Sequence, residues 1–367
     1  MKKLLILLTV SLMVFGLAAC STPKAKTFEL ALITDIGEID DKSFNQGAWE
    51  GLKKYADANK KTYAYYKPTD PTTDAYISAI DLAVKAGAKV IVTPGWMFEL
   101  PVYKAQDTYP NVKFILLDGS PNNGDFSNNM ANFKAKINTN VYSIFYREEQ
   151  SGFLAGYAAV KDGYTKLAFM GGKIFPAVIR FGYGFAQGAE YAAKELGKTE
   201  ITLKYHYTGD FADTPENKAK AASWYQAGVE VIFAAGGKIG NSVMSAANDV
   251  SKKVIGVDVD QSAESPTVIT SAMKELGNSV FSALDMNYKN TFPGGNSDHL
   301  GADVNGIGLP QDFSRFKTFK KADYDAIFEK LVANTITVKN DVDGGDEAGV
   351  PDATKLGLTA VTISFEK

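Results

Sequence analysis

Short apolar segments alternate with helical patterns along most of this chain, and the whole alternation occurs twice. In the first half, residues typical of buried strands occupy 28–34, 62–66, 89–93 and 112–117. Apolar residues at helical spacing lie between them, at 43–55, 73–86 and 98–108. Because strands and helices alternate at this spacing, the pattern predicts right-handed βαβ units and a parallel sheet. No other feature of the sequence constrains the fold as strongly.

The alternation starts again after Val141. A helix rich in Gly and Ala is predicted over 149–160 and another over 177–195, with strands over 166–170, 201–207, 229–234 and 253–257. We therefore expect an α/β fold of two doubly wound lobes with a ligand cleft between them. The first lobe is expected to contain residues 28–145 and to be completed by the tail, about 279–367. The second lobe is expected to contain 146–278.

The first twenty residues are typical of an export signal. Lys2 and Lys3 precede an apolar run over 4–17, which is too short to be a stable membrane span. Leu17 and the small residues Ala18 and Ala19 then lead directly into Cys20, the single cysteine of the chain, as at a bacterial lipoprotein cleavage site. We predict a signal peptide over 1–19, a lipid on Cys20 and a tether over 20–27. This places the protein on the extracytoplasmic face of the cell membrane, anchored through Cys20.

The composition argues against several classes of function. Lys and Arg total 39 and Asp and Glu total 42, so the net charge of −3 offers no basic excess for a nucleic acid polymer. One Cys and two His leave little material for a metal site or imidazole catalysis, so we expect no metal, no cofactor and no enzymatic activity. The glycine pairs at 171–172 and 236–237 lack the spacing of a phosphate-binding loop. A binding protein is the class that these counts favour.

Several predicted strands end in residues suited to ligand binding. Ligands of open α/β sheets bind beyond the carboxyl ends of the strands. The candidates at such positions are Asp35, Phe44, Asn45, Trp96, Asp118, Gly236, Gly237, Asp258 and Asp260. Some of them have a structural role as the alternative: Phe44 as a core residue of a helix capped by Ser43, and Asp118 as a turn former before Gly119.

One segment, DDKSFNQGAWEGL (40–52), resembles the hallmark of the basic membrane protein family. This family comprises substrate-binding lipoproteins of ABC transporters, of the purine nucleoside receptor type. Further matches are QSGFLAGYAA (150–159), the helix start at 184–188, AAGG (234–237) and GVD (256–258), so the resemblance runs from the cleavage site to about Lys274. It implies a type I periplasmic-binding-protein fold, and a purine nucleoside (guanosine, adenosine or inosine) delivered to an ABC transporter permease.

The resemblance also implies roles for individual residues. It puts the purine between two aromatic rings, Phe44 from the first lobe and Phe185 from the second. It makes Asn45 and Asp118 contacts to polar edges of the base or sugar, with Asp35 as an acidic residue at a strand end.

On the ribose side, the resemblance makes Asp258 the acceptor of the ribose hydroxyls, and Asp260 competes for this role. Gly236 would supply a backbone contact, with Gly237 beside it, and Lys274 would be the lysine of the cleft. Trp96 has no counterpart in the family pattern, although it follows a strand end.

Two other functions fit the same residues. A binding protein of the same fold for a sugar or another small metabolite also uses aromatic rings and paired carboxylates. An enzyme such as a nucleoside hydrolase or phosphorylase is the more distant alternative. We expect a monomer in either case.

Overall fold

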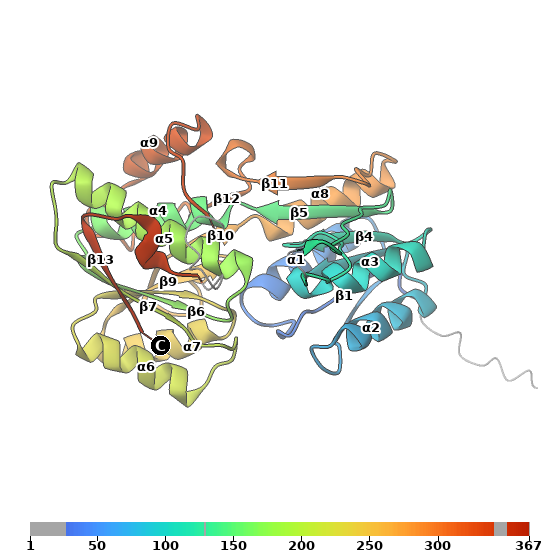
Figure 1. Ribbon diagram of the computed structural model, residues 1–367, viewed down its shortest axis with the longest axis horizontal. Coiled ribbons are helices and arrows are strands. Elements are labelled where there is room, and N and C mark those ends of the chain that lie inside the picture. The colour runs from blue at the N-terminus through green and yellow to red at the C-terminus, as the bar shows by residue number, and fades with distance from the viewer. Residues whose placement is uncertain (1–26, 128–129, 341–350, 367) are drawn as a thin grey trace, which may run out of the picture.

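The computed structural model describes residues 27–127, 130–340 and 351–366, in which two lobes lie side by side (Figure 1). The predicted α/β fold is confirmed, because each lobe holds a largely parallel sheet with helices on both faces. The signal peptide, Cys20 and nearly all of the tether lie outside the described residues. Among the described residues, no helix combines the length and apolar character needed to cross a membrane.

The sheet of the first lobe has six parallel strands in the order β11-β5-β4-β3-β1-β2. They are β1 (Leu30–Ile33), β2 (Tyr63–Tyr66), β3 (Val90–Pro94), β4 (Lys113–Leu117), β5 (Val141–Tyr146) and β11 (Ser297–Leu300). Helices α1 (Phe44–Ala58) and α8 (Leu276–Tyr288) cover one face, and α2 (Thr73–Lys85) and α3 (Glu99–Thr108) the other. Successive residues of β1 point to opposite faces: Leu32 joins the cluster of Leu52 in α1, and Ile33 joins that of Ile80 in α2.

The sheet of the second lobe has seven strands in the order β12-β10-β9-β8-β6-β7-β13. They are β6 (Lys166–Gly171), β7 (Ile201–Tyr207), β8 (Val231–Ala235), β9 (Lys253–Asp258), β10 (Val268–Lys274), β12 (Ile307–Gly308) and β13 (Val361–Phe365). Helices α4 (Glu148–Lys161) and α5 (Pro176–Glu195) cover one face, and α6 (Pro215–Gln226) and α7 (Ile239–Val250) the other. The remaining helix, α9 (Lys321–Val332), packs near α4.

Helices α4 and α5 pack unusually close together, and this explains the small residues in the segment over 150–159. A Cβ on Gly156 of α4 would lie 2.1 Å from the carbonyl oxygen of Phe185 in α5, and one on Gly188 of α5 would lie 1.9 Å from that of Phe153. No side chain fits at these distances, so the two helix backbones approach closely only because both positions are glycine. The small residues therefore serve helix packing.

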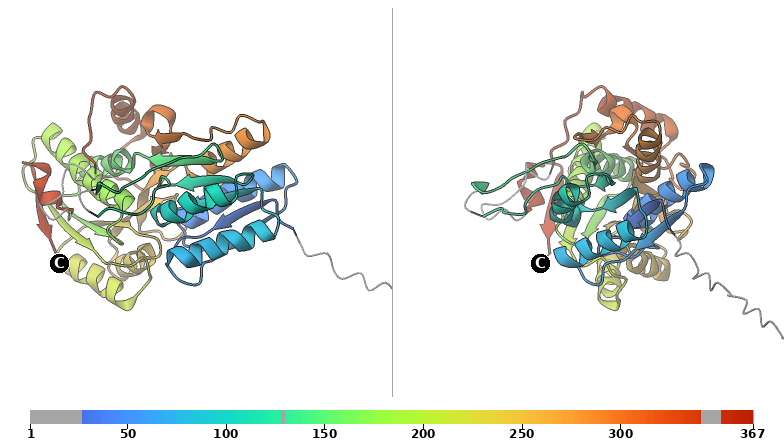
Figure 2. Two further views of the ribbon diagram at one scale, coloured as in Figure 1. Left: turned by 45° about the vertical axis from the view of Figure 1, so that its right-hand side comes forward. Right: turned by 90° about the vertical axis from the view of Figure 1, so that its right-hand side faces the viewer.

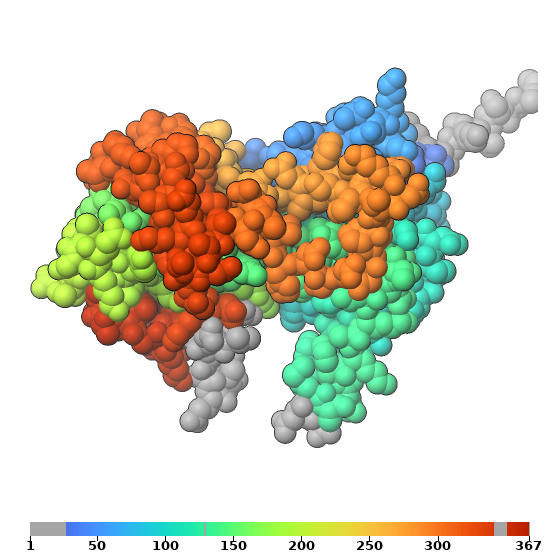
Figure 3. Space-filling model, turned by 90° about the horizontal axis from the view of Figure 1, so that it is seen from above, coloured from blue at the N-terminus to red at the C-terminus, as the bar shows by residue number. Residues whose placement is uncertain are grey.

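We had expected the tail, about residues 279–367, to belong wholly to the first lobe. This expectation was wrong, because the tail is divided between the two lobes. Helix α8 and strand β11 do join the first lobe, but β12 pairs with β10 and β13 pairs with β7 in the second. The end of the chain is held there by side chains, since both oxygens of Glu190 in α5 accept hydrogen bonds from backbone N–H groups of residues 359–361. Seen from above, the orange and red C-terminal segments run over both lobes (Figure 3).

Three connections between the lobes lie within the described residues: from β5 to α4, from β10 to α8, and from β11 to β12. The loop between β4 and β5 projects from the first lobe (Figure 2), with an isolated bridge between Asn122 and Ala135. The three connections begin or end at neighbouring strands, β11 and β5 at one edge of the first sheet and β12 and β10 at one edge of the second.

Candidate ligand-binding site

A cavity of about 470 Å³ lies between the lobes, beyond the carboxyl ends of their strands. The first lobe contributes the segments that follow β1, β3 and β4, and the second lobe those that follow β6, β7, β8 and β9, together with the end of β10. This is where open α/β sheets bind ligands. Its charged and amide side chains are those of Asp35, Glu38, Asp41, Asn45, Asp118, Lys173, Asp210, Asp213, Lys238, Asp258 and Lys274.

The loop between β1 and α1 is organised by two carboxylates. Asp41 accepts hydrogen bonds from the backbone N–H groups of Ser43 (2.9 Å), Asn45 (3.0 Å) and Gln46 (3.1 Å). Asp41 is therefore the residue that caps α1, a role that we had expected of Ser43. The amide nitrogen of Asn45 also donates to Asp35 at 2.8 Å and to Asp41 at 3.0 Å, which fixes Asn45 at the cavity wall. Burial raises the pKa of Asp41 to about 6.

Ser43 makes no capping hydrogen bond because its hydroxyl is used elsewhere. It donates across the cleft to Asp258 of the second lobe. On the same side, the amide nitrogen of Gln261 donates to the backbone oxygen of Lys42 at 2.8 Å. The lobes are therefore in direct contact in this structure.

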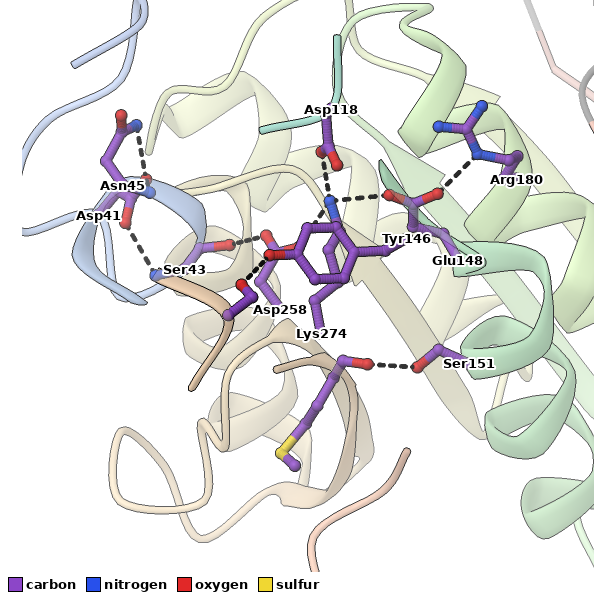
Figure 4. Close-up of polar contacts among 12 residues, drawn as sticks. Asp41, Ser43, Asn45, Asp118, Tyr146, Glu148, Ser151, Arg180, Asp258 and Lys274 are labelled. Atoms are coloured by element: carbon purple, nitrogen blue, oxygen red, sulfur yellow. Dashed lines mark hydrogen bonds and ion pairs between the residues drawn. The ribbon is translucent and has the colours of Figure 1, made fainter. Parts of the chain in front are cut away.

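Lys274, the last residue of β10, is the centre of a buried charge cluster (Figure 4). Its Nζ atom lies 2.5 Å from Asp118, 3.0 Å from Glu148 and 3.7 Å from Asp258. Glu148 in turn accepts a hydrogen bond from the Nε atom of Arg180 at 2.6 Å. Asp118 belongs to the first lobe, Lys274 and Asp258 to the second, and Glu148 begins α4 just after a connection between the lobes. The cluster therefore joins both lobes to the connection between β5 and α4.

Three carboxylates share one ammonium group, and this sets the pKa values of the cluster. Burial raises the pKa of Asp118 to about 7, although the positive charge of Lys274 acts to lower it. Burial also raises the pKa of Asp258. Burial alone would raise the pKa of Glu148 too, but Arg180 and Lys274 together hold it below its usual value. For Lys274, burial would lower the pKa, yet the three carboxylates keep it above its ordinary value. Lys274 therefore stays charged, while Asp118 titrates near neutral pH.

Asp118 and Asp258 share an unusual backbone conformation. Their φ angles are 55° and 66°, in the left-handed region that few residues other than glycine adopt. Such conformations persist where surrounding structure holds them, and they cluster at functional sites. The Oδ1 atom of Asp118 is buried without a hydrogen-bond partner in the described parts of the chain. This oxygen is an acceptor that a ligand in the cavity could satisfy.

Aromatic rings from both lobes line the cavity. Phe44 and Trp96 belong to the first lobe, and Phe175, Phe181 and Phe211 to the second. The Lys274 Nζ atom lies 4.5 Å from the ring centroid of Phe44 and 5.5 Å from that of Phe181.

Most of the residues predicted from the sequence line this one cavity. They are Asp35, Phe44, Asn45, Trp96, Asp118, Gly236, Gly237, Asp258 and Lys274. Two predicted residues lie elsewhere. Phe185 faces the sheet from the middle of α5 and is therefore fully buried in the core of the second lobe. Its ring packs on that of Phe233, with the two ring centroids 5.3 Å apart. Asp260 is exposed and accepts a hydrogen bond from the N–H of Ser262, so it serves the turn after β9.

Sequence reasoning missed Glu148, Arg180 and the second-lobe rings. An acidic residue in the first turn of a helix is ordinary, since it favours the helix dipole, so Glu148 gave no distinguishing signal. Phe211 follows β7, and the strand-end criterion applied to that strand would have found it. In the described residues, no group of His, Cys, Asp and Glu is arranged to hold a metal ion.

Comparison with known proteins identifies the family. Residues 28–341 match the model of the Bmp family, ABC transporter substrate-binding proteins of the PnrA-like type. The chain belongs to this family. Its members are substrate-binding components of transporters, so this chain is not an enzyme.

Relatives of this Bmp-family chain include three that are nearly coextensive with it. The ABC transporter nucleoside-binding protein BmpA of Lactococcus lactis is 30% identical over 342 residues, covering 86% of this chain and 91% of that protein. Basic membrane protein A of Borreliella burgdorferi is 28% identical over 346 residues, covering 92% and 96%. The CD4+ T-cell-stimulating antigen of Listeria monocytogenes is 28% identical over 335 residues, covering 86% and 88%.

Solved structures of other proteins share the fold of this chain. An ABC transporter solute-binding protein from Aeropyrum pernix matches with a TM-score of 0.67 and 24% identity, over 84% of this chain and 86% of that one. Another, from Conexibacter woesei, has a TM-score of 0.66 and 22% identity, over 85% and 98%. The two-lobed periplasmic-binding-protein fold expected from the sequence is thus confirmed.

Proposed function

We propose that this chain captures purine nucleosides between its lobes and delivers them to the permease of an ABC transporter. The observation that carries the proposal is the lining of the cavity, where aromatic rings from both lobes surround a buried cluster of carboxylates around Lys274. A nucleoside has a flat apolar base and a ribose rich in hydroxyl groups, and this cavity offers a partner for each.

The base is assigned to the space between Phe44 and Phe211. A stacking ring must present a face to the cavity, and both of these rings are only partly buried. Phe185 does not line the cavity, and Phe181 lines it but is only 2% exposed, so Phe211 offers more of its ring to a ligand. Phe211 replaces Phe185 as the second-lobe ring in our proposal. Stacking on aromatic side chains contributes about 1–3 kcal/mol per base in nucleic-acid proteins.

The polar groups of the nucleoside are assigned to the carboxylates. Asp118 has an unused buried oxygen, which suits an N–H donor on the edge of the base. Asp258 lies opposite, on the second lobe, and suits two ribose hydroxyls, with charge-assisted hydrogen bonds of about 1.5–3 kcal/mol each. Asp35, Asn45, Lys274 and the backbone at Gly236 complete the set of polar contacts. All of these residues line the cavity.

The charge of the cavity favours nucleosides over nucleotides. Seven carboxylates line it, against three lysines. One of those lysines, Lys274, is already shared by three carboxylates. A phosphate group would therefore meet net negative charge, and this repulsion supports discrimination against nucleotides.

We also propose that the chain works as a lipid-anchored monomer outside the cytoplasm. The support is the export signal over 1–19 and the position of the single cysteine at its end, Cys20. Two or more acyl chains on Cys20 would hold the protein stably at the membrane, near a permease.

The test is calorimetric titration of residues 27–367, refolded from denaturant to remove any ligand acquired during expression. Guanosine, adenosine, uridine, ribose and galactose are titrated in parallel. We expect tight binding of guanosine or adenosine and no heat with the free sugars. Binding of a sugar alone would overturn the ligand assignment while keeping the fold, and a silent response to all five would overturn the proposed ligand class.

A further inference from the structure

Three aromatic rings form a chain across the cavity, from one lobe to the other. Trp96 opens the short 3-10 helix Trp96–Phe98 after β3 of the first lobe, Phe175 directly precedes α5, and Phe211 follows β7 of the second lobe. The ring centroids of Trp96 and Phe175 are 5.4 Å apart, and those of Phe175 and Phe211 are 5.5 Å apart. All three line the cavity. Phe175 therefore links a first-lobe ring to the ring we assign to base stacking.

Trp96 is not held by the core of its own lobe. Its side chain is 38% exposed and takes no part in the hydrophobic clusters of either lobe. Its ring contact is with Phe175 of the opposite lobe. Gly95, at φ 117°, sets the backbone that presents Trp96, and a Cβ there would lie 3.3 Å from Asp35. The placement of Trp96 therefore serves the cleft.

The other two tryptophans contrast with Trp96. Trp49 packs edge-on against Tyr63 and Tyr65 within the first lobe. Trp224 is 2% exposed in the second lobe, where its indole N–H donates to Glu366 at 2.9 Å. Neither lines the cavity. Trp96 is thus the tryptophan whose surroundings change when the lobes separate.

We infer that Trp96 and Phe175 form a gate that closes over the bound ligand and sets how fast it is released. The inference rests on the proposed function, since it requires the cavity to be the ligand site. The two rings belong to different lobes, so their contact exists only while the lobes are closed. A contact made only in the closed state slows opening and leaves the entry of ligand into the open state nearly unchanged. Phe175 also packs on the edge of Phe211, which couples gate closure to stacking on the base.

The experiment measures release of tritiated guanosine after a chase with unlabelled guanosine, together with the association rate. The variants are Trp96→Ala, Phe175→Ala and the double variant. Trp96→Phe keeps a ring at the gate, and Phe126→Ala is a matched control, because Phe126 is an exposed aromatic residue that packs on Phe133 outside the cavity.

We expect each single variant to release guanosine about tenfold faster, with an association rate within about threefold of the parent. The double variant should be no faster than Phe175→Ala, because Trp96→Ala removes only the ring contact that Phe175→Ala also removes. Trp96→Phe should fall between Trp96→Ala and the parent, and Phe126→Ala should match the parent.

Two results would overturn the gate: release that is unchanged in Trp96→Ala, or effects that multiply in the double variant. Intrinsic fluorescence gives a second measurement, since guanosine should change the emission of the parent and this change should vanish in Trp96→Ala. If the parent binds neither guanosine nor adenosine, the proposed function fails and the gate fails with it. Binding with unchanged release would instead refute the gate alone.

Discussion

Replacing Lys274 by methionine tests the charge cluster at its centre. The change keeps a side chain of similar length but removes the cation that Asp118, Glu148 and Asp258 share. At 3.0 Å, the separation between Lys274 and Glu148, two charges attract by about 5 kcal/mol at an effective dielectric constant of about 20. Desolvation offsets much of this, and removing one partner of a buried pair typically costs about 3–5 kcal/mol. We expect Lys274→Met to lower the free energy of unfolding by that amount at pH 8.

The pH dependence of this loss identifies its cause. In the parent, Lys274 has a raised pKa and stays charged from pH 5 to 8, so it offsets the charge of the carboxylates around it over that range. In the variant, the pKa values of the remaining carboxylates rise further. The folded state then binds more protons than the unfolded state, and stability increases as the pH falls. The loss should therefore shrink markedly at pH 5.5.

The assay is thermal unfolding of ligand-free protein at pH 8.0 and 5.5, where we expect the melting temperature to fall by roughly 5–10 °C at the higher pH. Lys136→Met is the control, since Lys136 pairs with Asp107 at the surface and both are largely exposed. It should have little effect at either pH. An equal loss for Lys274→Met at both pH values would refute the reasoning, because it would show that the lost packing of the side chain matters and the charge does not.

Three further predictions concern the ligand. Phe44→Ala should weaken guanosine binding by about tenfold or more, and unchanged affinity by calorimetry would remove this ring from the stacking model. Asp258→Ala should bring the affinities for guanosine and free guanine close together, because ribose recognition is lost; if the two still differ as in the parent, another group binds the ribose. Guanosine affinity should fall as the pH drops below about 7, because burial raises the pKa of Asp118 and its protonated form is a weaker hydrogen-bond acceptor for the base. Asp118→Asn should flatten this pH profile, and a profile that keeps its slope in the variant would assign the titration to a different group.

The elements of the fold were largely readable from the sequence, because buried strands and amphipathic helices have local patterns. Strand β10 was an exception. Its residues VITSAMK (268–274) mix apolar and polar side chains, and we had predicted no strand there. Strand β13 was assigned to the wrong lobe, since its pairing with β7 joins segments far apart in the chain and depends on the contacts of Glu190.

The sequence by itself determined the two α/β lobes, the strand ends that face the cleft, and several of the residues that line the cavity, including Phe44, Asp118 and Asp258. Strand ends are local features, and the alternation of strands and helices fixes which edge they share. Only the tertiary structure decided which aromatic residues reach the cavity. Phe181 and Phe185 lie one turn apart in the same predicted helix, but of the two only Phe181 lines the cavity, while Phe185 is buried in the core of the second lobe.

Tertiary structure also decided the chemistry of Lys274. The three carboxylates around it come from the ends of β4 and β9 and the start of α4, separated by many residues in the chain. Their pKa values follow from burial and from mutual distance, and neither quantity exists before the lobes come together.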